Sequence, residues 1–377
     1  MNIAVGIDAI SFSTSKYFIT LKELAFHRNV DYAKYCDGIG QKKMSVFPPN
    51  EDIVTIAIDA AQKALSNVED KNSIDLLVFA TESSFDLSKS AGIYVHRFLG
   101  LRHDCRVFDI KQACYSATAA LHIAKSFIVD NPGSKALIIG SDIVKYPPGS
   151  SGEPTQGGAA VAIVMSENAK ILEIEPYSGI HTEDIMDFWR PAKSDEAMFD
   201  GKLSAYNYLK SMDFSLNRYL KKSKLRASDI NYACFHAPFG KMATKAAKQI
   251  FPHKNISDTL IYNEVIGNSC SASLYVCLLS LLENTKENMS RKRIGLYSYG
   301  SGSVAEYFSG IVIDEYRGSL FSLNHAKMLD DRIEISFDEY EKFCNHQFCI
   351  KNFYKNIGGV KLIDIEKGKR IYARINS

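Results

Sequence analysis

The sequence predicts an α/β protein built from two duplicated halves, and three observations carry that prediction. Short unbroken apolar runs alternate with helical patterns, as expected for strands that are buried on both faces of a sheet. The order of elements in the first half recurs in the second. Composition fits a large core, because 46% of the 377 residues are hydrophobic and 23% are charged.

In the first half, a helix is expected over residues 52–65, and a strand over residues 76–80 ends just before Glu82. A second helix pattern covers residues 88–99. A third helix is predicted to begin at Cys114, before a strand over residues 136–139. A loop rich in Pro, Gly and Ser follows over residues 146–158 and leads into a strand of small residues, 159–165.

The second half repeats this order. A helix is predicted over residues 204–221, and a strand over residues 232–235 ends at His236. A helix begins after Asn268, and a strand over residues 294–297 ends in Tyr-Gly-Ser-Gly. His236 lies 154 residues after Glu82 and Asn268 lies 154 residues after Cys114 (236 − 82 and 268 − 114). A duplication explains the shared offset, although helix–strand alternation is common to all α/β proteins. The charged segment after Asp330 has no clear place in this scheme.

Charge and hydropathy exclude several classes of function. Lys plus Arg exceed Asp plus Glu by 45 − 43 = 2, which gives no electrostatic case for a nucleic-acid or membrane partner. The longest apolar run, residues 274–282, is far shorter than the ~20 residues of a membrane span. The first ten residues carry Asp8 and show no signal peptide. No phosphate-binding or dinucleotide-binding glycine motif is present, and the eight cysteines include no Cys-x-x-Cys pair, so no metal site is expected.

Three residues are candidates for catalysis. Cys114 lies at a predicted helix start, where the helix dipole and free N–H groups are expected to lower the pKa of the thiol and make a nucleophile. Glu82 closes an apolar strand, so desolvation is expected to raise its pKa and suit it to general acid–base chemistry. His236 closes the matching strand. The alternatives are a buried structural cysteine, a surface ion pair and a satisfied core histidine.

A basic helix face follows His236. Lys241, Lys245 and Lys248 recur at helical spacing, which is typical either of a solvated face or of a phosphate-binding edge beside an active site.

At these residues the sequence resembles the 3-hydroxy-3-methylglutaryl-coenzyme A synthases of the shorter bacterial type, in the thiolase superfamily. The resemblance extends to about residue 340 and rests on many blocks in the right order. These blocks are Gly6-Ile7-Asp8, Gly38-Ile39-Gly40-Gln41, Ala80-Thr81-Glu82-Ser83, Gln112-Ala113-Cys114-Tyr115, Gly152-Glu153-Pro154-Thr155-Gln156-Gly157, Asp187-Phe188-Trp189-Arg190-Pro191, Asp200-Gly201-Lys202-Leu203-Ser204, His236-Ala237-Pro238-Phe239-Gly240-Lys241-Met242, Gly267-Asn268 and Tyr299-Gly300-Ser301-Gly302. The sequence departs from the family pattern at Gln112, Ser116, Cys270 and Cys277.

The resemblance implies a thiolase-like fold of two βαβαβαββ halves in an αβαβα layered architecture. We expect an N-terminal half at residues 1–166 with Glu82 and Cys114, and a C-terminal half at residues 167–377 with His236 and Asn268. The superfamily also implies a homodimer. A cytoplasmic enzyme of the mevalonate (isoprenoid) pathway is expected, without a cofactor, because coenzyme A (CoA) thioesters are its substrates.

The family further implies roles at matching positions. Cys114 is expected to take the acetyl group from acetyl-CoA, Glu82 to deprotonate the acetyl methyl, and His236 to hydrogen-bond the acetoacetyl ketone. The backbone N–H groups of Cys114 and Ser301 form the implied oxyanion hole. The remaining implied substrate contacts are Asp31, Tyr146, Thr155, Ser204, Lys241, Lys245 and Asn268.

Three other functions stay open on the sequence. A polyketide β-branching synthase would run the same condensation on acetoacetyl groups bound to a carrier protein. A ketoacyl synthase III would also use Cys, His and Asn, although decarboxylative condensation needs no base such as Glu82. A catalytically silent acyl-binding protein of the same fold is the third alternative, and the complete set of Cys114, Glu82 and His236 argues against it.

Overall fold

The computed structural model describes residues 3–192, 194, 196–344, 350 and 359–375. In this part of the chain, nine strands form one hydrogen-bonded sheet in the order β11-β12-β13-β8-β1-β7-β6-β4-β5. In chain order they are β1 (Gly6–Ser13), β4 (Ile74–Ala80), β5 (Arg106–Ile110), β6 (Lys135–Val144), β7 (Gly157–Ser166), β8 (Leu172–Thr182), β11 (Tyr232–Phe235), β12 (Arg293–Gly300) and β13 (Val304–Val312).

Shorter strands lie outside this sheet. They are β2 (Tyr17–Thr20), β3 (Lys43–Val46) and β14 (Ile333–Glu334) in one sheet, β9 (Phe188–Trp189) with β10 (Met198–Phe199), and β15 (Gly359–Glu366) with β16 (Lys369–Ile375).

The helices account for most of the remaining described chain. The α-helices are α1 (Leu21–His27), α2 (Ala33–Cys36), α3 (Ile53–Leu65), α4 (Ala91–Leu99), α5 (Ser116–Asp130), α6 (Gly201–Ser223), α7 (Gly240–Ile250), α8 (Ser257–Leu260), α9 (Asn263–Ile266), α10 (Ser273–Asn284), α11 (Ser322–Asp330) and α12 (Phe337–Cys344). Short 3-10 turns are η1 (Lys71–Ser73), η2 (Glu153–Thr155), η3 (Ala227–Asp229), η4 (Cys270–Ala272) and η5 (Tyr316–Ser319). No helix among the described residues is long and apolar enough to cross a membrane.

The predicted duplication is visible in the sheet. The first half runs β1-α3-β4-α4-β5-α5-β6-β7, and the second runs β8-α6-β11-α7-α10-β12-β13. Parallel pairing of β4 with β6 matches that of β11 with β12, and the last two strands of each half are antiparallel. The two halves differ at β5, because the short helices α8 and α9 occupy the corresponding stretch of the second half. β1 and β8 join the halves through two register pairs only, so the long sheet is two half-sheets with a narrow seam.

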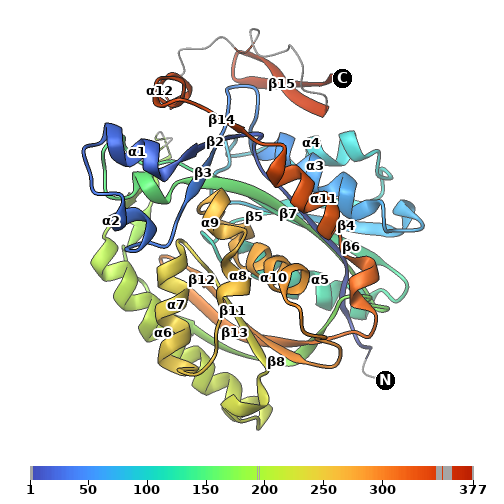
Figure 1. Cartoon of the computed structure of the whole chain (residues 1–377). Coiled ribbons are helices and arrows are strands. Elements are labelled where there is room, and N and C mark those ends of the chain that lie inside the picture. The colour runs from blue at the N-terminus through green and yellow to red at the C-terminus, as the bar shows by residue number, and fades with distance from the viewer. Residues whose placement is uncertain (1–2, 193, 195, 345–349, 351–358, 376–377) are drawn as a thin grey trace.

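Two helices fill the space between the half-sheets. Figure 1 shows α5 and α10 in the middle of the molecule, with α3 and α4 on one side and α6 and α7 on the other. Ten of the twelve residues of α10 are buried, which explains why its sequence is apolar on every face. Small residues on α5 (Ala117, Ala120 and Ala124) are fully buried and let this helix lie close to β4 and β6. The Thr118 hydroxyl of α5 lies 3.0 Å from the Tyr275 hydroxyl of α10. This arrangement confirms the predicted α/β layered architecture.

Most predicted elements occur within a few residues of their expected bounds, and two details differ. The helix that was expected to begin at Cys114 begins at Ser116, and the helix after Asn268 begins at Ser273 after the turn η4. The helix starts are therefore 157 residues apart, whereas the ends of β4 and β11 (Ala80 and Phe235) are 155 apart. The predicted domain boundary falls at the end of β7. The segment after Asp330 forms β14, which pairs with β2, then α12 and the β15–β16 hairpin, with gaps in the described chain between α12 and the hairpin.

Candidate active site

Cys114 lies on a tight turn between β5 and α5. Ala113 has a left-handed backbone with φ of 43°. The Ser116 hydroxyl accepts a hydrogen bond from the Gln112 N–H and donates one to the Ala113 carbonyl, each 2.7 Å long. This ties the turn to the first residue of the helix. The Cys114 side chain is thus held in one place, half-buried, two residues before α5.

The thiol of Cys114 lies among acidic groups. A hydrogen bond from the Cys270 thiol lowers the pKa of Cys114, but burial and the carboxylates of Glu82, Asp142 and Asp187 raise it, and the net direction is upward. The predicted lowering of this pKa is wrong in direction. The prediction weighed the helix start alone, whereas the carboxylates come from three distant segments of the chain.

Glu82 follows β4 and points toward the same group. Its side chain is only 5% exposed, and its carboxylate accepts a hydrogen bond from Arg190 at 2.7 Å. Burial raises the pKa of Glu82 to about 7, with a further contribution from Asp142 that Arg190 and the Cys270 thiol oppose. The predicted raised pKa is confirmed. A carboxyl group of this kind exchanges a proton readily near neutral pH.

Asp142 holds the turn that carries Glu82. This residue of β6 is fully buried, and its Oδ1 accepts hydrogen bonds from the backbone N–H of Glu82 (2.9 Å) and from the side chains of Thr81 (2.7 Å) and Ser83 (2.6 Å). Its Oδ2 accepts from the N–H (3.0 Å) and the hydroxyl of Ser271, in the second half. One buried carboxylate therefore fixes the turn that carries Glu82 against the segment that carries Cys270.

His236 occupies the equivalent position after β11. Its backbone N–H donates to the Tyr297 carbonyl at 2.8 Å, and its carbonyl accepts from the Tyr208 hydroxyl at 2.6 Å. The ring is buried, and its Nδ1 has no hydrogen-bond partner among the described residues. Burial lowers the pKa of His236 to about 3. The imidazole is therefore neutral at physiological pH and can donate a hydrogen bond through only one ring nitrogen.

Hydrogen bonds connect Ala237, the residue after His236, to the segment with Asn268 and Cys270. The Ala237 carbonyl accepts from the side chains of Asn263 (3.1 Å) and Ser273 (3.0 Å), which flank the segment with Asn268 and Cys270. The Asn268 side chain accepts a hydrogen bond from the Cys270 N–H at 2.9 Å. Cys270 in turn contacts Cys114 and Glu82, so the two halves meet at this segment.

The predicted substrate residues Tyr146 and Thr155 also belong to this group. The Thr155 carbonyl accepts from the Asn268 N–H at 3.2 Å, and the Thr155 side chain hydrogen-bonds the Tyr146 phenol. Burial raises the pKa of Tyr146, as do the nearby groups of Glu82, Cys114 and Cys270. Tyr146 is therefore a neutral hydroxyl beside Cys114.

Ser301 lies close to the turn that carries Cys114. Its carbonyl accepts a hydrogen bond from the Gln112 side chain at 3.2 Å. The neighbouring Gly300 packs so tightly on this turn that an added Cβ would lie 2.5 Å from the backbone carbonyl oxygen of Gln112. This contact brings together the two backbone segments of the implied oxyanion hole.

The remaining predicted residues lie farther out. Ser204 is half-buried in the first turn of α6. Lys241 and Lys248, together with Lys42 and Lys254, line a pocket of about 410 Å³ beside α7. Lys245 is exposed on α7, and Asp31 is exposed before α2; neither lines this pocket.

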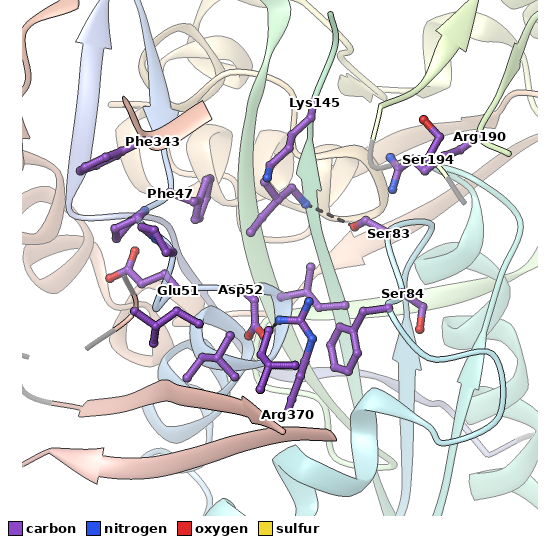
Figure 2. Close-up of a pocket in the computed structure, with 18 of the residues that line it drawn as sticks. Phe47, Glu51, Asp52, Ser83, Ser84, Lys145, Arg190, Ser194, Phe343 and Arg370 are labelled. Carbon is purple, nitrogen blue, oxygen red and sulfur yellow. Dashed lines mark hydrogen bonds and ion pairs between the residues drawn. The ribbon is translucent and has the colours of Figure 1, made fainter. Parts of the chain in front are cut away.

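A larger pocket of about 720 Å³ borders Glu82 on its other side. Ser83 and Arg190 line it, with Lys145 and residues of the β15–β16 hairpin such as Arg370. Figure 2 shows Arg190, Lys145 and Arg370 around this hollow, with Ser83 beside the strand that carries Lys145. Arg190 therefore separates the buried carboxylate of Glu82 from this open space.

The sequence alone does not identify several residues of the site as functional groups. Asp142 lies three residues after the predicted strand 136–139, and an acid close to the end of a buried strand is the available signal. Arg190 was visible only as part of the Phe-Trp-Arg-Pro block. Cys270 was noted as a departure from the family pattern, but nothing in the sequence placed it against Cys114.

Comparison with known proteins identifies the family. The family model described as hydroxymethylglutaryl-coenzyme A synthase N terminal matches residues 2–170, and its C-terminal counterpart matches residues 172–252 and 243–361. The chain belongs to the hydroxymethylglutaryl-CoA synthase family. The same architecture occurs in a crystal structure of HMG-CoA synthase complexed with CoA, which matches with a TM-score of 0.92 and 34% identity over 99% of this chain and 100% of that one.

Two curated members of the family illustrate its breadth. Hydroxymethylglutaryl-CoA synthase of Enterococcus faecalis is 41% identical over 349 residues, which cover 90% of this chain and 91% of that protein. The polyketide biosynthesis 3-hydroxy-3-methylglutaryl-ACP synthase PksG of Bacillus subtilis (strain 168) is 33% identical over 372 residues, which cover 90% and 87%. Acyl-transferring condensation is thus the chemistry of this family, on either CoA or carrier-protein substrates.

Proposed function

We propose that the protein condenses acetyl-CoA with acetoacetyl-CoA and water to give 3-hydroxy-3-methylglutaryl-CoA and CoA. The observation that carries this proposal is the junction of the two halves, where a buried carboxyl with a pKa of about 7 (Glu82) lies beside a thiol (Cys114) and a neutral imidazole follows the equivalent strand (His236). These are the groups needed to hold an acyl chain, to remove a proton and to polarise a ketone.

The first step is acyl transfer. The sulfur of Cys114 attacks the thioester carbon of acetyl-CoA, the proton of Cys114 passes to the departing CoA sulfur, and acetyl-Cys114 remains. Because the pKa of Cys114 is raised, the resting nucleophile is a thiol. We propose that the backbone N–H groups of Cys114 and Ser301 stabilise the oxyanion of this step.

The second step forms the carbon–carbon bond. Glu82 takes a proton from the acetyl methyl, and the resulting carbanion attacks the ketone carbon of acetoacetyl-CoA. The ring N–H of neutral His236 hydrogen-bonds the ketone oxygen, with Asn268 close to the acceptor. The new alkoxide gains one proton, and the proton that Glu82 took from the methyl accounts for it. Water then hydrolyses the thioester and frees Cys114.

The pocket beside α7 supports binding of CoA. Lys241 and Lys248 line it, and their ammonium groups suit the phosphates of CoA. Lys42 and Lys254 line it too, but Lys42 pairs with Glu264 at 2.6 Å and Lys254 donates to the Asn231 carbonyl at 2.9 Å. Lys245 is exposed on the same helix but does not line this pocket, so we assign the phosphate contact to Lys241. We include in the proposal a mevalonate-pathway role without a cofactor, since both thioesters are substrates.

The proposal includes two further expectations. A cytoplasmic location fits the free thiol state of all seven described cysteines, which reducing compartments maintain. A homodimer fits the edge position of β5, where Val107, Phe108 and Ile110 are only half-buried and one row of backbone groups is available for strand pairing. A mass of one chain by light scattering would contradict the dimer.

The direct test is product formation with the two free CoA thioesters. Wild type is expected to yield 3-hydroxy-3-methylglutaryl-CoA by mass spectrometry, and Cys114→Ala is expected to yield none. Cys277→Ala, which removes a buried thiol from the middle of α10, is the matched control and should retain activity. A Cys114→Ala variant that still condenses would overturn the assignment.

The acceptor can be a carrier protein instead of free CoA, and the likeness to PksG favours testing this alternative. Turnover of free acetoacetyl-CoA should exceed turnover of carrier-bound acetoacetate if the lysine-lined pocket serves CoA. The opposite ranking would assign the protein to polyketide β-branching. Condensation of malonyl thioesters that is unaffected in Glu82→Ala would instead indicate a ketoacyl synthase.

A further inference from the structure

Cys270 is a second thiol at the reacting sulfur. Its Sγ lies 2.8 Å from the Sγ of Cys114, although the two residues are 156 positions apart in the chain. The two thiols come from equivalent places, just before α5 and just before α10. The pair therefore forms only when the two halves are packed together.

The backbone holds Cys270 firmly in this position. It has a left-handed conformation with φ of 45°, its N–H donates to Asn268, and the next residue, Ser271, is bound to the buried Asp142. Such a fixed side chain retains its contact with Cys114.

The two thiols differ in how a reagent can reach them. Cys270 is 1% exposed, whereas Cys114 is half-buried at the site where substrate must arrive. A small oxidant therefore meets Cys114 first. Cys270 also hydrogen-bonds the Glu82 carboxylate, which places a proton acceptor beside the second thiol.

We propose that Cys114 and Cys270 form a reversible oxidation site, in which Cys270 resolves oxidised Cys114 as an intramolecular disulfide. The oxidant class is a hydroperoxide. This site deepens the proposed function because it uses the same nucleophile, and it makes the enzyme inactive but recoverable under oxidation.

The chemistry balances in two steps. The Cys114 sulfur attacks one peroxide oxygen, the O–O bond breaks, and a sulfenic acid and water form from hydrogen peroxide and the thiol. The Cys270 sulfur then attacks the Cys114 sulfur, the S–O bond breaks, and hydroxide leaves. Glu82 takes the Cys270 proton and passes it to this hydroxide as water. In total two thiols lose two electrons and two protons, and hydrogen peroxide becomes two waters.

Disulfide formation with Cys270 determines whether oxidised Cys114 can be reduced again. A cysteine sulfenic acid without a partner goes on to the sulfinic acid, which thiol reductants do not reverse. A disulfide is reduced by thiols. Acetyl-Cys114 has no free thiol to oxidise, so acetyl-CoA is expected to protect the site.

The experiment uses the reduced full-length chain. Wild type, Cys270→Ser and Cys270→Ala are each treated with hydrogen peroxide, catalase removes the excess, and half of each sample receives dithiothreitol. Peptide mass spectrometry then identifies the state of Cys114. Condensation activity is expressed relative to the untreated activity of the same variant.

Wild type should lose activity, contain a peptide pair that links Cys114 with Cys270, and regain most of its activity with dithiothreitol. The Cys270 variants should regain less than about a tenth of theirs and carry sulfinic acid at Cys114. Cys277→Ala, with its thiol buried elsewhere on α10, should behave like wild type.

Equal recovery in wild type and both Cys270 variants would overturn the proposal. So would sulfinic acid at Cys114 in wild type without any linked peptide pair. The mass readout does not require condensation activity, so an inactive but oxidisable protein would refute the proposed function and leave the oxidation site intact.

Discussion

Glu82 and His236 occupy equivalent positions in the two halves, and burial acts on them in opposite directions. Each lies just beyond the carboxyl end of a buried parallel strand, β4 for Glu82 and β11 for His236. Burial raises the pKa of Glu82 to about 7 and lowers the pKa of His236 to about 3. In both cases the neutral form is favoured, because a low-dielectric surrounding penalises charge of either sign.

The difference between the two positions lies in their partners. Glu82 has the guanidinium of Arg190 and the thiol of Cys270, which hold its pKa near neutrality. Among the described residues no acidic group raises the pKa of His236, and burial is the cause of its shift. The first half therefore carries a group that can change its charge during turnover, and the second half carries a neutral hydrogen-bond donor.

The largest expected effect comes from removing the base. Glu82→Gln keeps the shape of the side chain but cannot accept the methyl proton. We expect the condensation rate to fall by about 10²–10⁴-fold. The rate of product formation at saturating thioesters measures this, and Glu82→Asp should fall between the two. Wild-type turnover in Glu82→Gln would remove Glu82 from the mechanism.

The two strand-end residues should also give opposite pH dependence of stability. The folded-state pKa of Glu82 is above its ordinary value of 4.5, so its contribution to stability is lost as pH rises from about 4.5 to 7. The folded-state pKa of His236 is below its ordinary value of 6.5, so its contribution is lost as pH falls from 6.5 to about 3. Between pH 4.5 and 6.5 the two contributions nearly cancel in wild type.

Replacing either residue alone should reveal the pH dependence of stability that the other residue contributes. Relative to wild type, the free energy of unfolding of Glu82→Gln should rise with pH across this window, by up to about 1.4 kcal/mol per pH unit. In His236→Asn it should fall with pH by a similar amount. Denaturant unfolding at several pH values measures both, and parallel slopes in the two variants would break the comparison.

Removing Arg190 should shift the pH profile of catalysis. The pKa of Glu82 is held down in part by the Arg190 guanidinium, so Arg190→Gln should raise this pKa and move the rising limb of the rate toward higher pH. A shift of about one pH unit corresponds to a tenfold loss of rate on the rising limb. Lys145→Gln, which removes another cation of the same pocket, is the control. An unchanged limb in Arg190→Gln would contradict the role of Arg190.

The smallest expected effect concerns the lysines of α7. Lys241 lines the pocket beside α7 and Lys245 does not, so Lys241→Ala should raise the KM for acetoacetyl-CoA several-fold more than Lys245→Ala. A contact of about 1 kcal/mol between an exposed cation and a phosphate corresponds to roughly a fivefold change in KM. A fall in kcat at unchanged KM would be evidence against a phosphate contact.

Local sequence patterns predicted correctly which strands and helices carry the site residues. Apolar strands such as residues 76–80 and 232–235 end where the structure ends them, so Glu82 and His236 could be placed at strand ends from the sequence. Cys114 could be recognised before a helix because small residues follow it. These positions could be predicted because each depends on the hydrophobic pattern of the residues next to it in the sequence.

The electrostatics of the site could not be predicted in the same way. Whether the pKa of Cys114 rises or falls depends on Asp142, Asp187 and Glu82, which approach it only in the folded chain. The contact between Cys114 and Cys270 likewise depends on how the two halves pack together. Such long-range contacts have no signature in either segment alone.

The central claim is that Cys114 holds the acetyl group while Glu82 activates it, and one measurement separates these tasks. Glu82→Gln is mixed with acetyl-CoA, then with acetoacetyl-CoA, and its intact mass and acetylated peptide are followed over time. The account predicts a single acetyl group on Cys114 that forms readily and persists after the second substrate is added. An acetyl group on any other residue, or one discharged into product at the wild-type rate, would contradict it.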